Sequence, residues 1–214
     1  MSASTSPPPR LTPAQAWQRL HEGNERFVSG RAAHPNQDAQ RRESLAAGQN
    51  PFAVIFGCSD SRLAAEIIFD LGLGDTFVVR TAGQVLGGGS LGSLEYAVAE
   101  LGVPLVVVLG HDSCGAVTVT NQAFESGQMP GGFVRDLVEA IMPSVVAASR
   151  AQADSAQVND MVREHTRQTA ERIVDQSRIV ADAVQEGRTA VVGVFYNLRD
   201  GHAELLSSTS ALPR

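Results

Sequence analysis

The stretch PFAVIFGCSDSR, at residues 51–62, decides the fold that we predict for this chain. It opens with a short apolar run between a proline and a glycine, which is the pattern of a buried β-strand. A second run of the same kind, PLVVVLGHDSC, occupies residues 104–114. Strands so rich in valine, isoleucine and leucine are typical of a parallel sheet that helices cover on both sides.

Strand and helix patterns alternate on either side of these two runs. Further strands are predicted at residues 76–80, 190–196 and 202–206, the last two joined by a turn at Asp200-Gly201. Helical spacing of apolar residues fills most of the intervals, at 62–70, 91–101, 115–125, 134–149 and much of 156–186. The sequence therefore predicts an α/β fold with a mainly parallel central sheet, an antiparallel C-terminal edge strand and helices on both faces.

Two segments come before this core. Residues 1–10 are rich in serine and proline and are predicted to be a disordered tail. Residues 11–48 are predicted to form a helical arm, which could pack on its own domain or on a partner subunit. Residues 49–214 form the α/β core, and the length suits one domain over residues 11–214.

Composition excludes several classes of function. The net charge is −6, and all 17 basic residues are arginine, since the sequence contains no lysine. A Walker-type phosphate loop, a Schiff base and a lysine general base are therefore excluded. The arginines are scattered, so we expect no nucleic-acid partner. No apolar run is long enough to span a membrane and none resembles a secretory signal, which predicts a cytoplasmic protein.

Two short motifs follow directly after the two strongest strands. CSDSR begins at Cys58, and HDSC runs from His111 to Cys114. Because the carboxyl ends of parallel strands meet at the same edge of a sheet, the two motifs are expected to converge. Two thiolates and one imidazole favour zinc over magnesium or calcium. Three protein ligands also leave one tetrahedral position free, as in catalytic zinc sites.

Asp60 and Arg62 lie beside these predicted ligands. Two thiolates make zinc-bound water less acidic than in a tris-histidine site, where its pKa is about 7. Activity is therefore expected to rise toward alkaline pH. Asp60 is placed to accept a hydrogen bond or a proton from this water, while Arg62 could hold Asp60 off the metal. If that pair broke, Asp60 could become the fourth ligand and close the site. The two residues could also form only a structural ion pair, or cap a helix.

Taken together, the motifs resemble those of the β-class carbonic anhydrases, and the match runs from EGNERFVSG at residues 22–30 to the final strands. The resemblance implies that Cys58, His111 and Cys114 bind one zinc ion per chain. It also implies that Asp60 and Arg62 form a catalytic dyad. The expected reaction is the reversible hydration of carbon dioxide to bicarbonate and a proton, by attack of a zinc-bound hydroxide.

The same resemblance implies a substrate pocket and a state of association. The residues at the pocket positions are Gln49, Phe77, Ala82 and Tyr96, with Gln49 as a hydrogen-bond donor to the substrate. We expect a homodimer or homotetramer, with pocket residues supplied across the interface and the N-terminal helix wrapped around the neighbour. Arg80 matches an arginine of a regulatory bicarbonate site in some members. Ile55 stands where those members carry tryptophan, so that regulation is not expected here.

Several alternatives stay open on the sequence alone. The same fold could hydrolyse carbon disulfide or carbonyl sulfide, or the chain could be a non-catalytic zinc or redox protein. The hypothesis of a nucleotide-binding domain is supported only by the parallel sheet, and a fold alone is weak support for a function. Residues 87–90, GGGS, read as a flexible loop and lack the spacing of a phosphate site. The remaining histidines are expected at the surface, namely His21, His34, His165 and His202.

Overall fold

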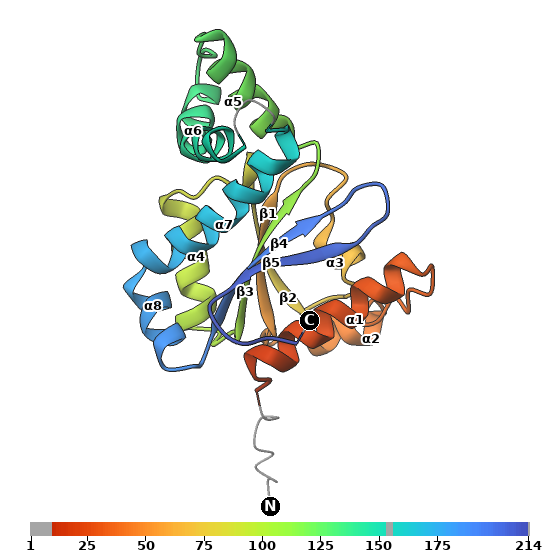
Figure 1. Ribbon diagram of the computed structural model, residues 1–214. Coiled ribbons are helices and arrows are strands. Elements are labelled where there is room, and N and C mark those ends of the chain that lie inside the picture. Colours follow the sequence, from red (N-terminus) through yellow and green to blue (C-terminus); the bar gives the residue numbers. More distant parts are fainter. Residues whose placement is uncertain (1–9, 153–155, 214) are drawn as a thin grey trace, which may run out of the picture.

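The computed structural model describes residues 10–152 and 156–213, so all of the predicted tail except Arg10 lies outside the described residues. Five strands form one sheet in the order β2-β1-β3-β4-β5 (Figure 1). The first four strands in this order pair in parallel, and β5 pairs antiparallel with β4. The predicted fold class is therefore confirmed. The strands are β1 (Ala53–Cys58), β2 (Thr76–Thr81), β3 (Leu105–His111), β4 (Ala190–Tyr196) and β5 (Ala203–Ser208).

Helices cover both faces of the sheet, as predicted. Helices α1 and α3 lie on one side, α4, α7 and α8 lie on the other, and α5 and α6 project beyond the carboxyl ends of the strands (Figure 1). A short 3-10 turn, η1 (Ala82–Gln84), follows β2. The helices are α1 (Pro13–Val28), α2 (Ala39–Ser44), α3 (Ala65–Ile68), α4 (Gly88–Ala99), α5 (Gly115–Ser126), α6 (Val134–Ala151), α7 (Val158–Gln176) and α8 (Arg178–Gln185).

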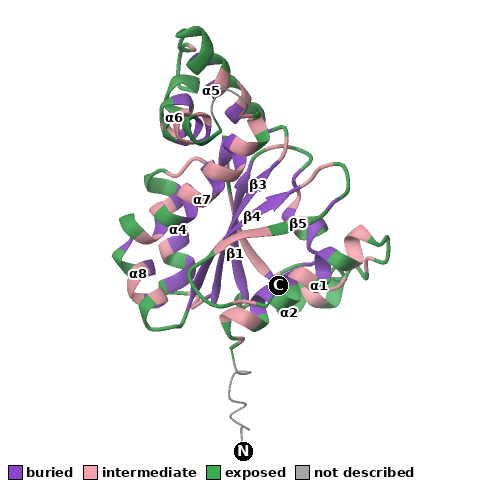
Figure 2. Cartoon of the chain, in the orientation of Figure 1, coloured by how far each residue is buried: buried purple, intermediate pink, exposed green. Residues whose placement is uncertain are grey.

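The three central strands are buried along their whole length (Figure 2). Successive side chains of β1 enter two different hydrophobic clusters: Ile55 packs with residues of α1 and α3, and Phe56 packs with residues of α4, α7 and α8. Full burial of one such side chain contributes about 1.5–3 kcal/mol. This alternation explains why the strand patterns are continuous apolar runs and why both faces need helices.

Helix α1 begins at a capping box in which the side chains of Thr12 and Gln15 each accept from the other residue's backbone N–H. Its apolar face, with Trp17 and Leu20, is buried in the core of its own chain. The Trp17 indole also donates to the carbonyl of Pro213, at 2.9 Å. In the described part of the chain, no helix has the length and apolar character that crossing a membrane requires.

Two local expectations are wrong. Residues 87–90 do not form a flexible loop, because the Gly87 N–H donates to the Ser90 hydroxyl at 2.8 Å and α4 begins at once. The helix predicted at 62–70 is only the four residues of α3. The helical pattern over 156–186 contains a break at Ser177, which leaves helical geometry and caps α8 by accepting from Val180.

The surface position predicted for His165 is also wrong, since this side chain is 1% exposed. Helix α7 is polar in sequence, and that polarity suggested a solvated helix. In the fold, however, α7 lies between α6 and the sheet, with contacts to α5, α6, β3 and β4. A helix enclosed in this way buries polar side chains as well as apolar ones.

Candidate metal centre

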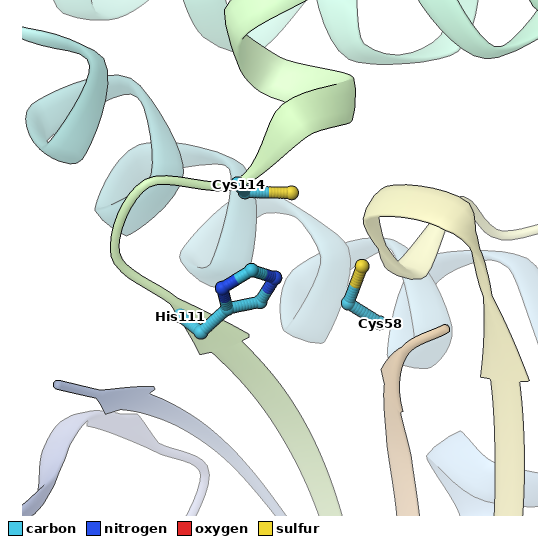
Figure 3. Close-up of side chains that lie close together, drawn as sticks. All are labelled: Cys58, His111 and Cys114. Atoms are coloured by element: carbon cyan, nitrogen blue, oxygen red, sulfur yellow. The ribbon is translucent and has the colours of Figure 1, made fainter. Parts of the chain in front are cut away.

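Three side chains converge at the carboxyl ends of β1 and β3, the edge that the sequence predicts. Cys58 ends β1, His111 ends β3, and Cys114 lies just before α5 (Figure 3). Their ligand atoms all lie within 4.8 Å of one another, and all three residues are buried. Both cysteines are free thiols, so the disulfide considered for a redox protein is not formed. The register of adjacent strands brings the three together.

The His111 ring is oriented for coordination. Its Nδ1 lies 2.9 Å from the carbonyl oxygen of Asp112, and since a carbonyl only accepts, Nδ1 carries the proton. Nε2 is therefore left as a lone-pair donor. This atom is buried and has no hydrogen-bond partner among the described residues. A buried nitrogen without a partner that faces two sulfur atoms fits a bound metal ion, because coordination would satisfy it.

The two thiols lie close enough to interact with each other. The hydrogen bond between them lowers the pKa of Cys58 and, together with burial, raises the pKa of Cys114. The Gly83 backbone N–H also donates to the Cys58 sulfur, at 3.2 Å. A divalent cation at this place would favour both thiolates, which is the state in which cysteine binds zinc.

Asp60 and Arg62 form the ion pair that the sequence suggests. Arg62 donates from Nε to Oδ1 at 2.9 Å and from Nη2 to Oδ2 at 2.7 Å, and its backbone N–H also donates to Oδ1. These hydrogen bonds hold the pKa of Asp60 well below its usual range. The Asp60 Oδ2 lies 3.9 Å from the His111 Nε2. The carboxylate therefore borders the metal centre while Arg62 holds it.

Arg80 supports the loop that carries these groups. Its Nε donates to the carbonyl of Cys58 at 2.9 Å, and its Nη2 donates to the carbonyl of Asp60 at 2.6 Å. Arg80 thus fixes the backbone between a predicted ligand and the dyad.

The four predicted pocket residues are not gathered in one chain. Ala82 opens η1, the turn that contacts Cys58. Phe77 pairs with Val54 near the start of β1, four residues from the level of Cys58, or about 13 Å along the strand. Phe77 contacts Tyr96, with ring centroids 6.1 Å apart.

Gln49 is still farther from the metal centre, because it precedes β1. It is exposed in a cavity of about 470 Å³ at the amino ends of the strands, lined also by Phe52, Asp75 and Pro104. Within one chain, therefore, Gln49, Phe77 and Tyr96 cannot reach a substrate at the metal centre.

Two neighbours of the centre were missed from the sequence. Gly83, on η1, contacts the Cys58 sulfur, and the buried His165, on α7, contacts Gly83. Both are distant in sequence from the CSDSR and HDSC motifs. A lone glycine after a strand and a histidine in a polar helix carry no spacing signal, so only the packing of α7 on η1 reveals them.

An α/β sheet that brings two cysteines and one histidine together, bordered by an ionised carboxylate, offers the ligand set that a single-metal hydrolytic or hydrating enzyme uses. A carbonic anhydrase family model matches residues 53–203. The chain is 52% identical over 197 residues to carbonic anhydrase 2 of Mycobacterium tuberculosis, covering 92% of this chain and 94% of that protein. It is 49% identical to a carbonic anhydrase of Mycolicibacterium smegmatis, covering 93% and 96%.

Solved structures of β-carbonic anhydrases have the same fold. One tetrameric enzyme from Sordaria macrospora superposes with a TM-score of 0.72 at 23% identity, covering 91% of this chain and 98% of that one. The enzyme CafA of Aspergillus fumigatus superposes with a TM-score of 0.69 at 26% identity, covering 91% of each chain. This chain belongs to the carbonic anhydrase family, in its β class.

Proposed function

We propose that this protein catalyses the reversible hydration of carbon dioxide to bicarbonate and a proton, using one zinc ion held by Cys58, His111 and Cys114. The observation that carries the proposal is the convergence of these three ligand atoms, within 4.8 Å of one another, in a chain of this family. The unpartnered, buried Nε2 of His111 supports the same ligand set.

The zinc ion, when bound, would supply the Lewis acidity that makes water a nucleophile near neutral pH. Asp60 would then orient the attacking water through Oδ2, the oxygen nearest His111. Because Arg62 keeps the pKa of Asp60 well below its usual range, this carboxylate stays ionised. At neutral pH it is too weak a base to take up a proton, but it is a good hydrogen-bond acceptor. The proton is released to buffer.

We also propose that the substrate pocket is completed by a second copy of the chain, in a homodimer or a larger homo-oligomer. Gln49, Phe77 and Tyr96 lie on or beside the β2 edge of the sheet or before β1, away from the metal centre of their own chain. Tyr96 is 48% exposed, although it is a large aromatic residue. A twofold partner would bring such residues beside the neighbour's centre. Residues 11–48 are the segment proposed to reach that neighbour.

The location proposed for the enzyme is the cytoplasm. Cys58 and Cys114 must remain reduced to bind zinc, and both are free thiols. A reducing compartment maintains that state.

The proposed function is tested by measuring carbon dioxide hydration from pH 6 to 9 and zinc content on the same sample. We expect one zinc per chain and a rate that rises toward alkaline pH, as two thiolate ligands imply. The ionised Asp60 does not titrate in this range, so the rise in hydration rate reflects a titration at the metal centre. If the chain binds one zinc ion but does not hydrate carbon dioxide at alkaline pH, the proposed enzymatic activity is refuted.

The role of Asp60 is tested with Asp60→Asn and a matched control, Asp136→Asn, which removes an exposed carboxylate on α6. Asp60→Asn should keep its zinc and lose about 10²-fold in rate or more, whereas the control should match the wild type. Full activity of Asp60→Asn at every pH would exclude the dyad while leaving the enzyme class intact.

A further inference from the structure

His165 is a buried histidine that the reaction itself does not use. It lies on α7 and is 1% exposed. Its Nε2 is 2.9 Å from the carbonyl oxygen of Gly83, and its Nδ1 is 3.1 Å from the hydroxyl of Ser144 on α6. Because a carbonyl oxygen only accepts, Nε2 must carry a proton and donate it. The ring therefore bridges helix α6 and the turn η1.

The turn that His165 holds has an unfavourable backbone. Gly83 has φ of 63° and Gln84 has φ of 42°, and the left-handed region is disfavoured for a residue with a side chain. A Cβ added to Gly83 would lie 2.8 Å from the Cβ of Ala116 and 3.0 Å from the Cδ1 of Ile141. The turn is thus wedged between α5 and α6, and this conformation must be maintained by its surroundings.

A second contact joins the same turn to the same helix. Gln84 is fully buried, and its Nε2 donates to the hydroxyl of Thr166, the residue next to His165, at 3.4 Å. This bond is long, whereas the His165 bond is of ordinary length, so His165 is the stronger of the two restraints. Two successive residues of α7 therefore anchor two successive residues of η1.

The other side of the turn touches the metal centre. The Gly83 N–H donates to the Cys58 sulfur at 3.2 Å, and the turn lies directly beside Cys58 (Figure 3). An N–H directed at a thiolate fixes the direction of its lone pairs and withdraws part of its negative charge. The chain of contacts thus runs from α7 through Gly83 to a predicted ligand.

We propose that His165 is a positioning residue for the metal centre, which acts through Gly83 to hold the N–H that binds the Cys58 sulfur. This inference rests on the proposed metal role of Cys58. Without the His165 bond, η1 would relax from its left-handed geometry, and Cys58 would lose both its orientation and part of its charge neutralisation. Removing such supporting contacts at metal sites typically weakens metal binding by about 10- to 100-fold.

The test compares His165→Leu with His165→Gln in the full chain. Leucine fills space without a donor, whereas glutamine keeps an N–H that can reach the Gly83 carbonyl. Ile173→Ala is the matched control, because Ile173 is a fully buried residue of the same helix that packs in the cluster on the far side from the metal ligands. It should lower thermal stability without touching η1.

Two readouts are needed, neither of which is activity. The first is the rate at which bound zinc passes to a chromophoric chelator. The second is the near-ultraviolet thiolate-to-metal charge-transfer band of the cobalt(II)-substituted protein, which reports the electron density at sulfur. We expect His165→Leu to release zinc about 10- to 100-fold faster and to shift the cobalt band. His165→Gln and Ile173→Ala should resemble the wild type in both.

The inference is overturned if His165→Leu keeps the wild-type release rate and cobalt band, or if Ile173→Ala loses metal equally fast. Should His165→Leu not fold, His165→Asn takes its place, since its shorter side chain cannot reach the Gly83 carbonyl. A wild-type chain that binds neither zinc nor cobalt overturns the proposed function as well. Wild-type binding with an unaffected His165→Leu overturns only the role of His165.

Discussion

The two ends of the central sheet differ in how much of a site one chain completes. At the carboxyl ends of β1 and β3, the side chains of Cys58, His111 and Cys114 are buried and face one another. At the amino ends and along the β2 edge, Gln49, Phe77 and Tyr96 are spread out and partly or largely exposed. The metal half of the site is therefore formed within a single chain, whereas the proposed substrate half requires a second one.

The position of each strand in the sheet explains this difference. β1 and β3 are adjacent and central, so the loops that follow them must meet over the core. β2 is an edge strand whose side chains are mostly half-buried. Edge strands with apolar side chains are usually covered, and a second copy of the chain is one way to cover them.

The largest loss of activity should come from removing a ligand in the metal half of the site. Cys58→Ser replaces a thiolate with a hydroxyl, which is a poor zinc ligand at neutral pH. We expect zinc content to fall below stoichiometric and carbon dioxide hydration to fall to the rate of buffer alone, with the fold retained by circular dichroism. Stopped-flow hydration and metal analysis on one sample measure both. A fully active Cys58→Ser protein would contradict the ligand assignment.

A substitution in the substrate half should cause a smaller loss of activity, and a second chain with an intact substrate half should restore that activity. Gln49→Ala removes the proposed hydrogen-bond donor to the substrate and should reduce kcat/KM by about 10²-fold, with zinc unchanged. When Gln49→Ala and Cys58→Ser chains are unfolded together and refolded, mixed dimers should contain one complete site. Activity should then recover to about a quarter of the wild-type value per chain, as random pairing in a twofold dimer requires.

The control for this mixing experiment pairs Cys58→Ser with Cys114→Ser. Both substitutions damage the metal half, so no mixed dimer has an intact centre and no recovery is expected. If the first mixture also stays inactive, Gln49 does not act across an interface.

A smaller effect is expected from a substitution that weakens the association of the two chains, because the two halves of the site then meet less often. Phe77→Glu puts a carboxylate on the β2 edge, and burying it against a partner without a counter-charge is unfavourable. The dissociation constant should rise by about 10-fold or more, equivalent to roughly 1.4 kcal/mol. Sedimentation velocity over a dilution series would detect it. Phe133→Glu, at an 88% exposed position before α6, is the control and should leave association unchanged.

The last effect is on stability and not on activity or association, and it concerns the support of the metal half by His165. Burial lowers the pKa of His165 from 6.5 to about 4, with the positive charge of Arg172 adding to the effect, although the Gly83 carbonyl and the Cys58 charge oppose it. Between these values the unfolded chain binds the extra proton and the folded chain does not. His165 therefore contributes stability that is fully present above about pH 6.5 and falls as the pH drops toward 4.

This loss should have a slope on the order of 1 kcal/mol per pH unit. It is measured by urea unfolding of the zinc-free protein between pH 4 and 7, compared with His165→Gln, which has no titrating ring. The variant should show a shallower dependence on pH. Equal slopes for the two proteins would mean that His165 is not held neutral in the fold.

Much of this protein could be predicted from local patterns. Residues 51–62 and 104–114 combine a buried strand with a motif directly after it, so strand type and ligand position follow together. Other features depend on neighbours distant in sequence. GGGS at residues 87–90 starts a helix because Ser90 caps it, and His165 is buried because α7 is enclosed.

By itself, the sequence determined the α/β fold, the family and the set of side chains that converge at one sheet edge. These depend on short-range patterns: apolar runs that must be buried, and motifs at the ends of the strands. Only the tertiary structure decided that Arg80 holds the backbone between Cys58 and Asp60, that η1 directs an N–H at Cys58, and that Gln49 lies at the opposite end of the sheet. Such contacts arise from the packing of distant segments, which no local pattern encodes.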